Sequence, residues 1–410
     1  MSKKDNVAAV PKYRFPEFAL DASIDYVAGG FIFDPITNRN HHADLPILAI
    51  TQEYGAIPRD EIDYKVSVTK KSLKAYKIVE KGDFIISLRS FQGGIEYSMY
   101  DGICSPAYII LRKKTNIIDQ YYKYYFKSHR FIQDLNKDLE GIRDGKMISY
   151  GQFSSILLPK PDEEEQKKIA DCLSSIDDLI SAEEKKLSLL NDYKKGWMQK
   201  LFPIEGKTVP EWRFPEFKDS KGWEKSNIEK ACYPSYSGGT PVTSKKEYYN
   251  GDIPFIRSGE IGKEKTELFL TSEGLDNSSA KMIEKGDVLM ALYGANSGDV
   301  AISPIKGAIN QAILCLRHKN NNAFLYHYLA FKKNWIVRTY IQGGQGNLSG
   351  EIVKSIELCS PQEPEEQNKI AEFLSGIDDL IGRQTDRIEA LKQHKKALMQ
   401  GLFPSIEEVL

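Results

Sequence analysis

The chain has 410 residues, 41% of them hydrophobic and 28% charged, and its formal net charge is −1. This is the composition of an ordinary soluble protein with about two or three domains. No apolar run is long enough for a signal peptide or a membrane span, so we expect a cytoplasmic protein with no membrane partner.

The near-neutral total conceals local differences in charge. The segment from 317 to 350 contains five Lys or Arg residues, two His residues and no carboxylate. Such a segment is a candidate for contact with an anionic polymer. The five cysteines show no C-x-x-C spacing, and we expect reduced, buried side chains rather than disulfides or metal ligands.

The sequence contains two copies of the same series of motifs, in the same order. The motif Tyr-Arg-Phe-Pro-Glu-Phe at 13–18 returns as Trp-Arg-Phe-Pro-Glu-Phe at 212–217. An Asp-apolar-Pro segment follows at 44–46 and again at 252–254, each time before a short apolar strand. An internal repeat of this kind predicts two similar folded units.

The next repeated motif is Lys-Gly-Asp, at 81–83 and 285–287. It precedes two continuous apolar runs, 84–88 and 288–292, which have the length of buried strands. Further strands are predicted at 107–111 and 312–316, and each is followed by an arginine, Arg112 or Arg317.

An aromatic-rich helix is predicted next in each half, at about 120–139 and 323–342. A glycine loop follows, at 141–145 and 343–346, and then a strand near Ile156 or Ile356. Each half is therefore a mixed α/β unit.

Each unit leads into a long helix, over about 164–203 and 370–404, in which apolar residues recur in alternating steps of four and three. The repeat predicts two helices that pack along one apolar seam as an antiparallel coiled coil, relating the halves by pseudo-two-fold symmetry. Polar residues interrupt both seams at equivalent steps, at Glu183 and Gln384 and at Lys194 and Lys395. The predicted seam residues are Ile169, Leu173, Ile176, Ile180, Leu187, Leu190, Trp197, Leu201, Ile370, Leu374, Ile377, Ile381, Ile388, Leu391, Leu398 and Leu402.

Motifs for catalysis are weak. Gly206-Lys207-Thr208 lacks the earlier glycine of a phosphate loop, because position 201 is leucine. Asp34 with Asp63 and Lys65 resembles the acidic-plus-lysine set of a metal-dependent nuclease, but such matches arise by chance in a charged chain. His41-His42 fits a solvated loop better than a metal site. We expect a binding protein with no metal and no catalytic residue.

Polar loop residues suited to base edges or phosphate are abundant in both halves, although each one alone fits an ordinary surface loop better. The candidates also include basic residues of 317–350, which could contact phosphate. They include paired glycines too, because a glycine lets the backbone approach a phosphate closely. The candidate DNA-binding residues are Arg39, Asn40, Gln52, Arg89, Gln92, Arg143, Lys146, Gly238, Gly239, Thr240, Arg257, Tyr293, Asn296, Lys332, Lys333, Arg338, Gln342, Gln345 and Asn347.

Taken together, these motifs resemble the specificity subunit of Type I restriction-modification enzymes. The residues that carry the resemblance in the second half are Gly238-Gly239-Thr240-Pro241, 251–256, 285–289, Pro361 with Glu366-Gln367, and 370–404. The first half repeats them at 44–46, 81–83, Pro161 with Glu165-Gln166, and 169–203, but has Gly29-Gly30-Phe31 in place of Gly-Gly-Thr-Pro. On this resemblance the domains are a first target-recognition domain (1–160), a central long helix (161–204), a second target-recognition domain (205–360) and a C-terminal long helix (361–410).

The resemblance implies a DNA-sequence-recognition subunit without its own active site. Each domain would read one half of a split double-stranded target, and the helices would dock two methyltransferase subunits that methylate adenine. Restriction subunits would cut unmethylated DNA in the full complex. S-adenosylmethionine, ATP and Mg are then expected in the partner subunits and no cofactor in this chain. The alternatives are a self-contained metal-dependent nuclease and a coiled-coil scaffold for protein partners.

Overall fold

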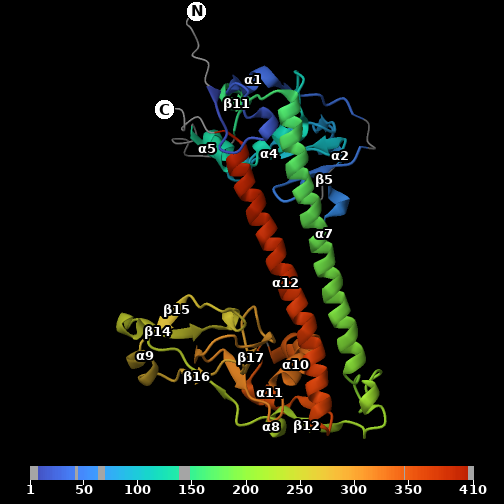
Figure 1. The fold of residues 1–410 in the computed structure, drawn as a ribbon, viewed down its shortest axis with the longest axis vertical. Coiled ribbons are helices and arrows are strands. Elements are labelled where there is room, and N and C mark those ends of the chain that lie inside the picture. Colours follow the sequence, from blue (N-terminus) through green and yellow to red (C-terminus); the bar gives the residue numbers. More distant parts are fainter. Residues whose placement is uncertain (1–7, 42–44, 63–69, 138–147, 346, 405–410) are drawn as a thin grey trace, which may run out of the picture. The chain divides into compact units, whose positions relative to one another are not determined.

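The computed structural model describes residues 8–41, 45–62, 70–137, 148–345 and 347–404. The chain divides into two compact units, one of residues 1–184 with 387–410 and the other of 185–386. The first of these is unit 1 and the second is unit 2. Each unit contains one part of each of the two long helices, α7 (Glu163–Leu201) and α12 (Pro364–Leu402) (Figure 1).

Unit 1 is a mixed α/β unit with short strands and short helices. Its strands are β1 (Ala8–Ala9), β2 (Ile24–Ala28), β3 (Phe33–Ile36), β4 (Leu48–Thr51), β5 (Gly55–Pro58), β6 (Lys77–Val79), β7 (Phe84–Ile86), β8 (Glu96–Tyr97), β9 (Gly102–Cys104), β10 (Ile109–Lys113) and β11 (Leu157–Pro159). Its helices before α7 are α1 (Gly29–Ile32), α2 (Lys70–Leu73), α3 (Ser90–Gly93), α4 (Asp119–Tyr125), α5 (His129–Asn136) and α6 (Tyr150–Ser155).

Unit 2 is also a mixed α/β unit, and among the described residues it contains two four-stranded sheets where unit 1 contains one. Its strands are β12 (Glu224–Asn227), β13 (Tyr236–Ser237), β14 (Tyr249–Ile256), β15 (Leu268–Leu270), β16 (Lys281–Ile283), β17 (Val288–Ala291), β18 (Val300–Ile302), β19 (Gly307–Ile309), β20 (Ile313–Leu316) and β21 (Glu357–Ser360). Its helices are α8 (Ile228–Ala231), α9 (Ser272–Asp276), α10 (Asn322–Ile336), a π-helix η7 (Val337–Gln345) and α11 (Gly350–Ser355).

Each unit contains an antiparallel four-stranded sheet with the same order of equivalent strands. The order is β3-β10-β7-β8 in unit 1 and β13-β20-β17-β18 in unit 2. The two predicted apolar runs form the third strand in each order, β7 and β17, and every residue of both strands is buried. The two halves thus share one sheet topology, as the sequence repeat predicts.

The Lys-Gly-Asp motif closes a turn and ties it to the neighbouring strand. Gly82 and Gly286 have φ angles of +102° and +94°, a left-handed conformation that glycine adopts without steric cost. In unit 1 the carboxylate of Asp83 accepts the Glu80 N–H at 2.7 Å and pairs with Arg112 of β10 at 2.8 Å. Asp287 does the same in unit 2, pairing with Arg317 at 2.6 and 2.7 Å.

The two long helices begin on a second repeated clamp. Arg14 pairs with Glu165 through two hydrogen bonds of 2.8 Å, and both side chains are at most 9% exposed. The next residue, Gln166, donates to the Pro161 carbonyl at 2.7 Å, and Gln367 donates to the Pro361 carbonyl at 3.0 Å. The arginine of the first repeated motif therefore fixes the start of a long helix.

The predicted seam is an apolar face in each unit. In unit 1, Ile169, Leu173 and Ile180 of α7 are buried, as are Ile388 and Leu402 of α12. In unit 2, the buried seam residues are Leu201, Ile370, Leu374 and Ile377. The remaining seam residues are half-buried, namely Ile176, Leu187, Leu190, Trp197, Ile381, Leu391 and Leu398.

Polar residues in the seam are paired within their unit. Lys395 of α12 binds Asp177 of α7 at 2.5 Å in unit 1, and Lys194 of α7 binds Asp378 of α12 at 2.5 Å in unit 2. In unit 1, Asp177 contacts Lys395 while the later α7 residue Glu183 pairs with the earlier α12 residue Arg387 at 2.7 Å, so the two helix segments run antiparallel. In unit 2, the Lys194–Asp378 pair and the contact between the Trp197 and Phe373 rings show the same direction. A paired polar residue in an apolar seam favours one register over others.

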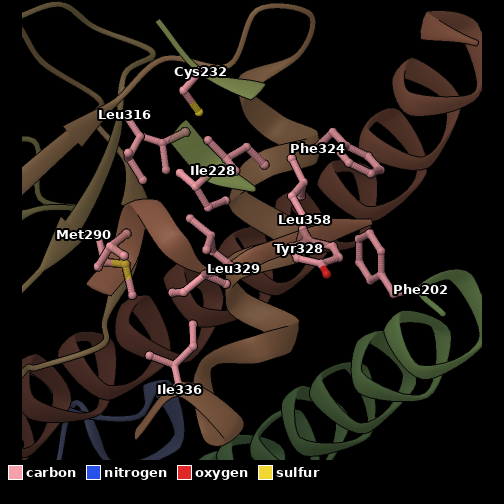
Figure 2. Packing of buried hydrophobic residues seen from close by; sticks show 14 of the residues in the cluster. Phe202, Ile228, Cys232, Met290, Leu316, Phe324, Tyr328, Leu329, Ile336 and Leu358 are labelled. Carbon is pink, nitrogen blue, oxygen red and sulfur yellow. The ribbon is translucent and has the colours of Figure 1, made fainter. Parts of the chain in front are cut away.

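The helix segments complete the cores of the two units. In unit 2, Phe202 after the end of α7 lies against Phe324 and Tyr328 of α10, with ring centroids 5.8 and 5.6 Å apart (Figure 2). In unit 1, Phe403 after the end of α12 packs in the same way against Tyr121 and Tyr125 of α4. Each unit therefore includes residues from both long helices in its core.

Two local predictions were wrong. The aromatic-rich helix expected over 120–139 is interrupted after Tyr125, because Ser128 caps a new helix by accepting the Phe131 N–H at 3.3 Å. The loop expected at 343–346 is helical through residue 345, as the end of the π-helix η7. The other predicted glycine loop, 141–145, lies outside the described residues.

Among the described residues, no helix is long and apolar enough to cross a membrane. Four of the cysteines are buried and Cys172 is half-buried, all of them free thiols. Burial raises the pKa of the Cys104, Cys232 and Cys315 thiols to about 12, so these side chains are un-ionised at neutral pH.

Candidate nucleic-acid interface

Three of the predicted DNA-binding residues of unit 1 lie together. The Gln52 side chain, at the turn after β4, donates from Nε2 to the Arg89 carbonyl at 3.1 Å. Arg89 immediately precedes α3, and Gln92 lies within it. All three side chains are exposed, so the fold brings two glutamines and an arginine from two separate segments to one solvent-facing surface.

The other predicted residues of unit 1 are not part of this group. Arg39 and Asn40 are exposed in the segment after β3, where the Asn40 N–H donates to Asn38 Oδ1 at 3.0 Å. Arg143 and Lys146 lie outside the described residues.

In unit 2, Gly238 and Gly239 have a packing role. A Cβ at Gly238 would lie 1.8 Å from the Ile309 carbonyl oxygen, and a Cβ at Gly239 would lie 2.5 Å from the Cβ of Ser279. We expected the absent side chains to admit a phosphate, whereas the structure places neighbouring protein atoms in that space. The adjacent Thr240 is exposed and donates its hydroxyl to Gln311 Oε1 at 2.7 Å.

Arg257 is held by two carboxylates. Its Nε donates to Glu260 at 3.1 Å, and its Nη2 also pairs with Glu267. Its positive charge is thus compensated within the protein, and these partners raise its pKa above the ordinary value.

Arg257 and Thr240 line one hollow of unit 2. Its volume is about 450 Å³, and the other lining residues include Tyr249, Phe255 and Asn250. Asn250 has a φ of +64°, which is uncommon for a residue other than glycine. Two residues chosen from sequence therefore converge on one concavity.

Tyr293 and Asn296 lie in the connection between β17 and β18, the counterpart of the α3 connection between β7 and β8. Both are half-buried, and Tyr293 packs against the core of unit 2. The equivalent connections of the two units thus carry different polar residues on equivalent sheets.

The segment 317–350 is less basic at its surface than its composition predicts. Lys333 pairs with Asp299 at 2.6 Å, and Arg317 is engaged by Asp287. The ammonium of Lys332 lies 5.5 Å from the ring centroid of Trp335. The composition of the segment therefore overstates its free positive charge, because Asp287 and Asp299, which lie outside it, compensate Arg317 and Lys333.

Arg338, by contrast, is exposed in η7. Gln342 and Gln345 belong to the same π-helix, and Asn347 is exposed just beyond it. The two histidines of the segment are buried, and burial lowers the pKa of His318 to about 4 and that of His327 to about 3.

Of the three residues in the nuclease hypothesis, the structure describes Asp34 alone. Asp34 pairs with Lys114 at 2.7 Å, while Asp63 and Lys65 lie outside the described residues. His41 Nε2 lies 3.1 Å from the Leu73 carbonyl oxygen. Within the described ranges, no group of three or more His, Cys, Asp or Glu side chains could hold a metal ion.

Both halves of the chain match the model of one known family. The model of the Type I restriction modification DNA specificity domain matches residues 30–192 and again residues 220–393. The chain belongs to this family. The two matches place one specificity domain in each half of the chain.

Individual relatives agree with the family. The type I restriction enzyme MjaVIII specificity subunit of Methanocaldococcus jannaschii is 28% identical over 371 residues, which cover 84% of this chain and 83% of that protein. The MjaIX specificity subunit of the same organism is 30% identical over 208 residues, 47% of this chain and 48% of that one.

A solved structure shares the fold along nearly the whole chain. The crystal structure of the Type I restriction-modification system S subunit from M. genitalium matches with a TM-score of 0.59 and 14% identity, covering 97% of this chain and 99% of that one. At this identity the likeness concerns the fold alone.

Sequence reasoning missed the residues that hold the specificity-domain loops in place. Lys127 and Asn136 bind backbone carbonyls of the α3 connection, and Gln311 accepts from Thr240. Their partners are 34, 45 and 71 residues away in the chain, respectively. No local pattern signals such contacts.

Proposed function

We propose that this protein is the DNA-recognition subunit of a type I restriction-modification enzyme and has no catalytic site of its own. Each unit would read one half of a split double-stranded target. The observation that carries the proposal is the double match to the DNA specificity domain, once in each half of the chain.

The differences between the equivalent connections support the reading of two different half-sites. The β7–β8 connection carries Arg89 and Gln92, whereas the β17–β18 connection carries Tyr293 and Asn296. Arginine pairs best with guanine and glutamine or asparagine with adenine, so unlike side chains on one scaffold specify unlike bases.

The partners follow from the same proposal. The long helices would dock two methyltransferase subunits, which use S-adenosylmethionine to methylate adenine, and restriction subunits with ATP and Mg would cut unmethylated DNA. The present chain would hold none of these cofactors. It would act in the cytoplasm, where the DNA targets are.

The test is an exchange of one unit. Residues 205–355 are replaced by the corresponding part of a related specificity subunit, and methylated adenines are mapped in cells that contain the methyltransferase subunits. We expect one half of the target to change and the other to remain. Alteration of both halves would contradict modular recognition, and methylation at unsplit sites would contradict the proposal itself.

A separate measurement tests the lack of catalysis. The purified chain alone is incubated with DNA, Mg and S-adenosylmethionine, and we expect neither cleavage nor methyl transfer. Cleavage that requires Mg and disappears in Asp34→Ala would identify a nuclease instead.

A further inference from the structure

The connection between β7 and β8 in unit 1 is fixed by side chains from three separate parts of the chain. Gln52 donates to the carbonyl of Arg89 at 3.1 Å, and Asn136 at the end of α5 donates to that of Phe91 at 2.7 Å. Lys127, between α4 and α5, donates to the carbonyl of Gly93 at 3.0 Å. These three hydrogen bonds fix the backbone of the connection from outside it.

Polar groups inside the connection are also hydrogen-bonded to one another. The Ser90 hydroxyl, which is buried, accepts the Ser87 N–H at 2.9 Å, and the Gly94 N–H donates to the Ser90 carbonyl at 2.9 Å. Gly94 has a φ of +79°, and a Cβ there would lie 1.9 Å from the Phe126 carbonyl oxygen. The chain therefore enters and leaves α3 in one defined geometry.

Lys127 has a second contact that explains its position. Its ammonium binds Glu96 Oε1 at 2.6 Å, and the Glu96 side chain is 1% exposed. Burial raises the pKa of Glu96, and the charge of Lys127 opposes this shift. Lys127 is thus committed to the protein interior and is not a free cation for phosphate.

The connection also has side chains that face solvent and could hydrogen-bond to the edges of DNA bases. Arg89 and Gln92 are exposed, and Leu88 is 50% exposed. Within the described part of the chain, no carboxylate forms an ion pair with Arg89, in contrast to Arg112 and Arg14 of the same unit. An arginine without a carboxylate partner on a fixed backbone keeps its donors available for a ligand.

We propose that residues 88–93 are the base-reading element of unit 1, with Arg89 and Gln92 directed at purine edges in the major groove and Lys127 and Asn136 as positioning residues. The inference rests on the proposed function and deepens it. The guanidinium fork matches O6 and N7 of guanine, and the glutamine amide matches N6 and N7 of adenine. Fixing the backbone in advance lowers the conformational entropy lost when these side chains bind.

The test uses the complex of the full chain with its methyltransferase subunits and maps methylated adenines. Arg89→Ala and Gln92→Ala should each lower methylation of the wild-type target by about ten- to a hundredfold and relax the sequence preference in the same half-site. The other half-site should keep its preference. Gln133→Ala is the matched control, because Gln133 is an exposed glutamine of α5 in the same unit.

The positioning role is tested with Asn136→Asp, which keeps the size of the side chain but cannot donate to the Phe91 carbonyl. We expect relaxed preference in that same half-site, while a loss of folding alone would lower methylation at all sites without changing their sequence. Lys127→Arg, which retains the charge and the donors, should preserve the preference.

The outcomes separate the two proposals. If the wild-type complex methylates a split target and both alanine variants keep the preference of each half-site, the base-reading element is elsewhere in unit 1 and this inference is wrong. If the wild-type complex methylates no split target, the proposed function fails first.

Discussion

The guanidinium of Arg213 and the carboxylate of Glu366 form two parallel hydrogen bonds, Nε to Oε1 at 2.7 Å and Nη2 to Oε2 at 2.5 Å. Their side chains are only 7% and 1% exposed. The Trp223 indole N–H also donates to Glu366 Oε1 at 3.3 Å. The pair therefore joins the repeated Arg-Phe-Pro motif of unit 2 to the first turn of α12.

Arg213→Ala should destabilise unit 2 strongly, because it leaves the Glu366 carboxylate buried without its partner. Removal of one member of a buried pair costs about 3–5 kcal/mol. Thermal unfolding measures this effect. Glu216→Ala is the control, because Glu216 is 47% exposed and its contact with Lys369 is long, at 3.8 Å. Equal melting temperatures for the two variants would contradict a structural role for the clamp.

Features with a short period were predictable from the sequence. The four-three spacing from Ile169 to Leu201 identified a helix face that is buried or half-buried at every apolar step, because helix geometry converts spacing directly into direction. The Lys-Gly-Asp motif likewise marked a turn, since its glycine needs a positive φ and its aspartate caps the backbone.

Contacts between distant segments were not predictable in this way. The pairing of Lys333 with Asp299 spans 34 residues, so the charge of a local window overstated how much of the basic segment is free. The break between α4 and α5 had a local signal, the capping Ser128, but the aromatic periodicity on both sides outweighed it. Gly238 and Gly239 were assigned to phosphate because their protein neighbours, Ile309 and Ser279, are unrecognisable from sequence.

In the helix seam, Ile388→Asp should destabilise unit 1 more than Leu391→Asp. Ile388 is 3% exposed whereas Leu391 is half-buried, and the cost of an unpaired charge rises with its burial. Lys185→Asp, at an exposed position, should be mild. Circular dichroism melts of the three variants provide the measurement, and equal melts would rule out the seam as a packed face.

Gly238→Ala should destabilise unit 2 rather than weaken DNA binding in a folded protein. The added Cβ would overlap the Ile309 carbonyl oxygen, whereas at Gly196 on α7 the same Cβ meets nothing within 4 Å. Gly196→Ala is thus the control and should be neutral or slightly stabilising, since alanine favours the helix by about 1 kcal/mol. A fully stable Gly238→Ala variant with reduced DNA binding would instead restore the phosphate interpretation.

The stability of unit 2 should fall with acidification because of His327. Burial lowers its folded pKa to about 3, and the nearby Lys194 contributes in the same direction. Among the described residues the imidazole Nδ1 has no hydrogen-bond partner, and the Asp378 carboxylate lies 3.8 Å from it. An unfolded histidine titrates near 6.5, so below that pH the unfolded state binds more protons than the folded state. The contribution of His327 is complete above about pH 6.5 and is lost as the pH falls toward 3, amounting to about 2 kcal/mol by pH 5.

Urea unfolding at pH 7.5 and pH 5 measures this slope. His327→Gln should flatten it, although it lowers stability at both pH values. His394→Gln, on the exposed face of α12, is the control and should leave the slope unchanged. A wild-type slope retained in His327→Gln would assign the pH dependence to other groups.

The last prediction concerns the salt dependence of DNA binding by the complex with its methyltransferase subunits. Arg338 is exposed, whereas Lys333 is paired with Asp299 and its charge is already compensated. If η7 faces DNA, Arg338→Ala should weaken binding to target and scrambled duplexes alike and reduce the slope of log K against log salt by about one. Lys333→Ala should reduce it less, because the ammonium of Lys333 is already bound by Asp299 and is less available to phosphate. Binding across a salt series gives both slopes, and an unchanged slope in Arg338→Ala would mean that this face of unit 2 does not contact the DNA backbone.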